Sequence, residues 1–135
     1  METQCVSRVS VDVVEKLAQE VTSSSTRVFV LPERILDKES LFVAIRETVP
    51  LDPPMMGNRY KWDALEDSLF SGLQSVAEPE VRIIWPNASR LLRASPGDFE
   101  MFVALLEDLA RQLADPDVTK GPVKNVTIIL GGTWE

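Results

Sequence analysis

Three short runs of apolar, largely β-branched residues constrain the fold of this chain most. They cover residues 27–31, 81–85 and 125–130, and proline or glycine follows each run. Such runs, bounded by turn residues and separated by helical patterns, are typical of strands in a parallel sheet covered by helices. We therefore predict an α/β fold, with a small three-stranded, mostly parallel sheet packed with about four helices.

The stretches around these runs carry helical periodicity. Apolar positions recur every three or four residues, and prolines end two of the periodic segments. The expected helices cover residues 38–49, 62–73, 87–92 and 96–115. A short amphipathic helix over residues 10–21 also fits the pattern.

Charge and composition exclude several classes of function. The formal net charge is −7, the basic residues are scattered, and there is no histidine and one cysteine, Cys5. We therefore expect no nucleic-acid partner, no zinc site and no internal disulfide. No apolar run approaches the ~20 residues of a membrane span, and the start of the sequence does not resemble a signal peptide. We expect a cytoplasmic protein without a membrane partner.

The segment from Lys61 onward combines two helical faces. One is an apolar stripe suited to the core, formed by Trp62, Leu65, Leu69 and Leu73. The neighbouring face carries Asp63, Glu66, Asp67 and Phe70. Like charges four residues apart on a helix cost about 0.2–0.5 kcal/mol per pair, so helix stability alone does not favour this face. An aromatic residue among acids predicts a docking surface for a basic protein.

Other interpretations of the same acids remain open at this point. Asp63, Glu66 and Asp67 are candidate ligands for a divalent cation or candidate acid/base groups. They are also compatible with an ordinary solvated face, and Phe70 with packing under a loop. Because no further oxygen ligands converge in the pattern, we predict no metal, no cofactor and no catalytic residue.

The chain resembles the barstar family of intracellular ribonuclease inhibitors. The resemblance rests on the Pro-Pro-Met-Met-Gly segment ending at Gly57, on the Trp-Asp-Ala-Leu-Glu-Asp-Ser-Leu segment starting at Trp62, and on the order of strands and helices. It covers roughly residues 27–130. We accordingly divide the chain into an N-terminal extension (1–26), a barstar-like domain (27–130) and a C-terminal tail (131–135).

The resemblance implies which residues bind the partner. In the family, the acidic helix and the loop before it plug the ribonuclease active site. Asp63 and Asp67 match the acids of that helix, with Asp67 as the phosphate mimic, and Asp108 is the nearest match to a further acid on the last helix. Glu66 and Phe70 lie beside them. The loop residues predicted to take part are Met55, Met56, Gly57, Asn58 and Tyr60.

This chain also departs from the family pattern. Glu66 and the Met55–Met56 pair stand where aromatic residues are common, and the loop before Asp63 is longer than usual. The predicted function is a non-enzymatic inhibitor or immunity protein that blocks a basic, secreted or toxin ribonuclease. The alternative is a binding or regulatory module of the same fold with a non-nuclease partner.

Overall fold

A computed structural model describes residues 5–20, 24–55 and 60–134 of the chain. Within them lies one sheet in which all neighbouring strands run parallel, in the order β1-β4-β3-β2. Its strands are β1 (Val6–Val9), β2 (Thr26–Val30), β3 (Glu80–Trp85) and β4 (Asn125–Gly131). The predicted α/β class is confirmed, but the sheet has four strands where three were expected.

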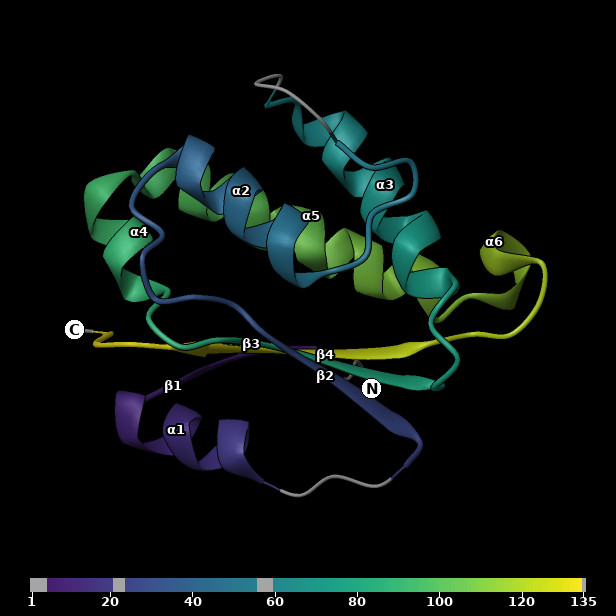
Figure 1. Ribbon diagram of the computed structural model, residues 1–135, viewed down its shortest axis with the longest axis horizontal. Coiled ribbons are helices and arrows are strands. Elements are labelled where there is room, and N and C mark those ends of the chain that lie inside the picture. The colour runs from purple at the N-terminus through teal and green to yellow at the C-terminus, as the bar shows by residue number, and fades with distance from the viewer. Residues whose placement is uncertain (1–4, 21–23, 56–59, 135) are drawn as a thin grey trace.

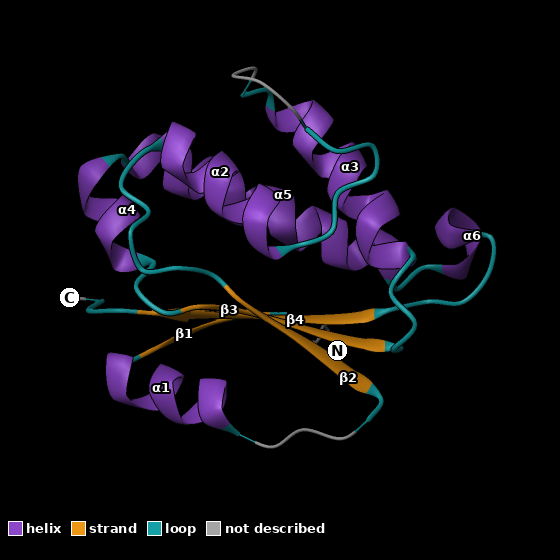
Figure 2. Cartoon of the chain, viewed as in Figure 1, coloured by secondary structure: helices purple, strands orange, loops and turns teal. Residues whose placement is uncertain are grey.

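Helices cover both faces of this sheet, unequally. On one face lie α2 (Lys38–Thr48), α3 (Trp62–Gln74), α4 (Ser89–Ala94) and α5 (Pro96–Leu113), as Figure 1 shows. The short α6 (Pro116–Thr119) follows α5, and α1 (Val11–Gln19) lies alone on the other face (Figure 2). The four predicted helices and the helix near residues 10–21 are therefore present, and α6 is an addition.

The main core fills the space between the sheet and the larger helical layer. Strand residues that alternate toward this layer, such as Ile83 and Ile128, are almost fully buried. Trp85 meets them from the end of β3, with its ring centroid 5.7 Å from that of Phe102 on α5. This core holds α3 and α5 side by side, which decides the geometry of the outer surface.

The fourth strand comes from the segment predicted as an N-terminal extension. Four residues with weak alternation do not identify a strand by themselves, but β1 pairs with the edge of β4 from Val6 to Val9. The following helix α1 buries Val14 to 1% exposure against Ile84 and Ile129. Gly131 permits this contact, because a Cβ there would lie 2.6 Å from a Val14 methyl carbon.

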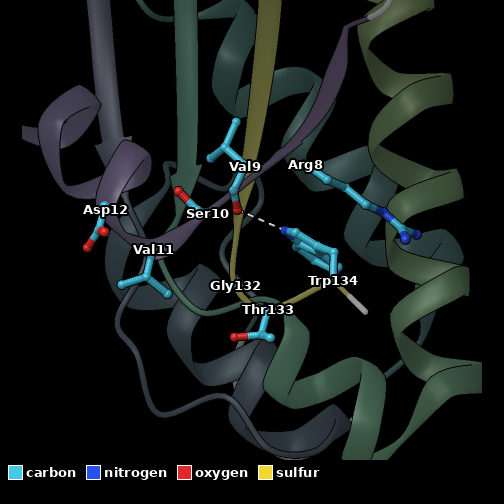
Figure 3. Close-up of a pocket in the computed structure, with 8 residues that line it drawn as sticks. All are labelled: Arg8, Val9, Ser10, Val11, Asp12, Gly132, Thr133 and Trp134. Carbon is cyan, nitrogen blue, oxygen red and sulfur yellow. Dashed lines mark hydrogen bonds between the residues drawn. The ribbon is translucent and has the colours of Figure 1, made fainter.

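Trp134 joins the C-terminal tail to this N-terminal strand. Its indole Nε1 donates a hydrogen bond to the Val9 carbonyl at 2.8 Å, as Figure 3 shows. The Arg8 guanidinium lies 4.8 Å from its ring centroid, and the Phe99 ring lies 6.0 Å away on α5. The contact buries Trp134 partly, so its place in the tail is explained by packing.

Candidate functional site

Helix α3 separates an apolar side from an acidic one. Leu65, Leu69 and Leu73 are fully buried, as their spacing predicted. Asp63 and Asp67 lie exposed on the outer side, one turn apart. Among the described residues, neither carboxylate forms a hydrogen bond or ion pair with another side chain. The two acids matched to the binding helix are thus available to a partner.

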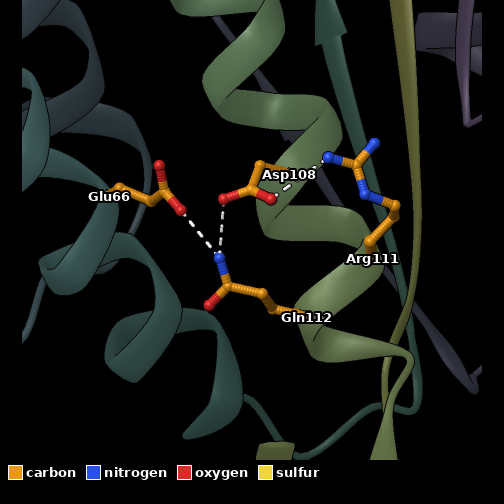
Figure 4. A network of polar contacts seen from close by, with 4 residues as sticks. All are labelled: Glu66, Asp108, Arg111 and Gln112. Atoms are coloured by element: carbon orange, nitrogen blue, oxygen red, sulfur yellow. Dashed lines mark hydrogen bonds and ion pairs between the residues drawn. The ribbon is translucent and has the colours of Figure 1, made fainter.

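A polar network joins α3 to α5 beside these acids (Figure 4). The Gln112 side-chain amide donates to Glu66 at 2.7 Å and to Asp108 at 2.8 Å. Arg111 binds the other oxygen of Asp108 at 3.1 Å. The structure therefore brings Asp108 of α5 next to Glu66 of α3, although the two helices are far apart in the sequence.

The two carboxyl groups of this network have shifted proton affinities. Partial burial, followed by the hydrogen bond with Asp108, raises the pKa of Glu66 to about 6. The same shared hydrogen bond, with support from Gln112 and Arg111, lowers the pKa of Asp108. Below the pKa of Glu66 the proton of the pair therefore resides on Glu66, because the shared hydrogen bond, followed by Gln112 and Arg111, stabilises the charged form of Asp108. Above this pKa both groups of the pair are mostly ionised and negatively charged.

Phe70 lies differently from the sequence interpretation. It is partly buried and packs against the main core, whereas we expected an aromatic anchor at the centre of the acidic face. Its helical position follows Leu69 by ~100°, which places it at the border between the two sides of α3. Part of the ring is still accessible, and a role in binding stays a prediction.

The loop before α3 is held at the residues that the structure describes. The Arg46 guanidinium on α2 donates to the Met55 carbonyl at 3.2 Å. The Tyr60 hydroxyl donates to Glu39 at 3.2 Å, and its ring packs edge-on against Phe42. Both Met55 and Tyr60 are partly buried. The other predicted loop residues, Met56, Gly57 and Asn58, lie outside the described residues.

Neither a metal-binding cluster nor a membrane-spanning helix is found in the described parts of the chain. No cluster of three or more acidic or cysteine side chains there is arranged to hold a metal ion. No described helix combines the length and apolar character needed to cross a bilayer. A separate hollow lined by residues 8–12 and 132–134 lies at the carboxyl ends of β1 and β4 (Figure 3), and none of the acids of α3 lines it.

The match to known families agrees with this geometry. A family model described as "Barstar (barnase inhibitor)" matches residues 26–121, which run from β2 through α6. The chain belongs to the barstar family. No curated protein and no solved structure matches it. The family match includes α3, the loop before it and α5, whereas β1, α1 and β4 lie outside the matched residues.

Several residues around this surface were missed by the sequence interpretation. Gln112 follows Asp108 by one helical turn, so its contact with that acid was visible as a spacing. Its contact with Glu66 was not, because it depends on the packing of α3 against α5. Glu39 and Arg46 carried no signal beyond an exposed, charged helix face, and only the structure places them at the loop.

Proposed function

We propose that this protein is a non-enzymatic inhibitor that binds a basic ribonuclease through α3, the adjoining part of α5 and the loop before α3. The observation that carries the proposal is the pair of exposed carboxylates of Asp63 and Asp67, which have no hydrogen-bond or ion-pair partner among the described side chains, on the helix that the family match includes. The Glu66–Asp108 pair extends the negative surface onto α5. We call these four acids the acidic surface.

The mechanism we infer is steric blockage with electrostatic mimicry of the substrate. A ribonuclease site must attract phosphates, so it is lined with cations, and carboxylates at matching positions satisfy the same groups. The net charge of −7 also favours rapid encounter with a basic enzyme at low salt. Inhibition should therefore be competitive with RNA, and its association rate should fall as salt is added.

The proposal predicts that Asp67→Ala weakens inhibition strongly. Removing one partner of a buried, hydrogen-bonded charge pair costs about 2 kcal/mol or more, roughly a thirtyfold loss of affinity, because the enzyme's cation is left unpaired. The measurement is RNA hydrolysis by barnase and a panel of other basic secreted ribonucleases, titrated with the wild-type protein and the variant. Growth rescue on co-expression tests the same interaction in cells.

Asp12→Ala is the matched control for this experiment. It makes the same chemical change at an exposed position in the first turn of α1, on the opposite side of the sheet from α3. We expect it to inhibit like the wild type. Equal inhibition by Asp67→Ala and Asp12→Ala would refute the assigned surface. Failure to inhibit any ribonuclease, together with specific capture of a non-nuclease protein, would support the alternative binding module.

A further inference from the structure

One face of α2 contacts Met55 and Tyr60, two described residues of the loop before α3. Glu39, Phe42 and Arg46 are three and four residues apart, so they lie along one stripe of the helix. Arg46 binds the backbone at Met55, while Glu39 and Phe42 hold the side chain of Tyr60. We call this stripe the α2 clamp. Three residues of one helix thus hold Met55 and Tyr60.

The start of the same loop is attached to α3. The Asp52 amide donates to the Ser68 carbonyl at 3.0 Å. Gly72 allows the backbone at Pro50 to approach, because a Cβ on Gly72 would lie 2.0 Å from the Pro50 carbonyl oxygen. The loop is therefore attached at its beginning to the helix that carries the acids, and further along to the α2 clamp.

Helix α2 is itself a rigid support. Its first turn is closed by a capping box, in which Asp37 accepts from the Ser40 amide at 2.8 Å and the Ser40 hydroxyl accepts from the Asp37 amide at 3.1 Å. Its inner side buries Leu41 and Ile45 in the main core. Contacts made by such a helix limit the freedom of the groups they hold, since the helix cannot move without disturbing the core.

We propose that Glu39 and Arg46 are positioning residues that hold Met55 and Tyr60, the described residues of the predicted binding loop, in place for the protein partner. This inference rests on the proposed function, in which that loop is part of the binding surface. Ordering a loop on binding costs conformational entropy, and a loop that is already held loses less. Neither residue needs to touch the partner to affect its affinity.

The single tyrosine of the chain makes the clamp measurable without any partner. Burial and the neighbouring Glu39 carboxylate raise the pKa of Tyr60. Replacing Glu39 by Gln removes the charge and keeps the size of the side chain, so the absorbance titration of Tyr60 should move to lower pH. Glu47→Gln, another exposed acid on α2, is the control and should leave that titration unchanged.

Hydrogen exchange and affinity complete the experiment. In Glu39→Gln and Arg46→Gln, we expect amide exchange near the loop to rise about three- to tenfold while exchange in the core of α2 stays slow. For a ribonuclease that the wild type inhibits, affinity should fall by a similar factor of about three to ten. Unchanged titration and unchanged exchange would overturn the clamp.

The two proposals fail in different ways. If Asp67→Ala weakens inhibition but neither clamp variant does, the acidic surface stands and the positioning role is overturned. If Asp67→Ala has no effect, the proposed function fails, while the Tyr60 titration and the exchange rates still decide whether α2 holds the loop. A melting curve for each variant confirms that the fold is retained.

Discussion

On its inner side, α3 buries Leu65, Leu69 and Leu73 completely, whereas on its outer side it exposes Asp63 and Asp67 one turn apart. The inner side has the composition that close packing favours. The outer side places like charges near one another. The pKa of the neighbouring Glu66 is raised to about 6. One helix therefore serves stability on one side and accepts a small loss of stability on the other. This difference is what a surface retained for binding is expected to have.

The largest effect should come from breaking the inner side. Leu69→Ala removes fully buried methyl groups from the main core and should lower the free energy of unfolding by about 2–5 kcal/mol, because a cavity remains. Chemical denaturation measures this loss. Asp67→Ala, on the other side of the same helix, should change the free energy of unfolding by less than about 0.5 kcal/mol. Similar losses in both variants would remove the contrast between the two sides.

A smaller effect is expected where α3 touches the loop. Gly72→Ala places a methyl group against the Pro50 carbonyl, so the backbone must shift at a cost of about 1–3 kcal/mol. The Tyr60 titration would also report whether the displacement reaches the α2 clamp. Gly97→Ala is the control, because a Cβ at that position meets nothing within 4 Å. Equal stability of the two variants would contradict the close contact.

The smallest effect should come from the outer side and depend on pH. Because the pKa of Glu66 is about 6 in the folded protein and 4.5 is its ordinary value, the folded state binds more protons between these limits. Its stability should therefore fall as pH rises through this window. Glu66→Gln removes that dependence, since glutamine does not ionise. At pH 7 the variant should be more stable by about 0.5 kcal/mol or less, because solvent screens the charges.

Denaturation of wild type and Glu66→Gln at pH 4 and pH 7 tests this sign. The two proteins should differ little at pH 4, where Glu66 is mostly protonated in both the folded and the unfolded state. A variant less stable than the wild type at pH 7 would show that Glu66 stabilises the fold. In that case its carboxylate would stabilise the fold, as the buried leucines on the inner side of α3 do.

Local patterns predicted most of the fold. Helical periodicity and flanking prolines located α2, α3 and α5, and apolar runs located β2, β3 and β4. Strand β1 was missed because its four residues pack weakly by themselves and are ordered by pairing with β4. The partial burial of Phe70 was not predicted for a related reason. The burial of a residue at the edge of a helix face depends on how far the neighbouring elements extend around the helix. Helical periodicity alone does not predict that extent.

The sequence by itself determined that α3 has an apolar and an acidic side, because both follow from the rotation of successive residues about a helix axis. It also indicated the family, because the motif around Trp62 and the order of the predicted elements follow from the sequence alone. Only the tertiary structure decided that Glu66 and Asp108 share one network through Gln112, and that Glu39 and Arg46 bind Tyr60 and Met55. Those contacts join residues from different elements, and their partners are chosen by how the helices pack on the sheet.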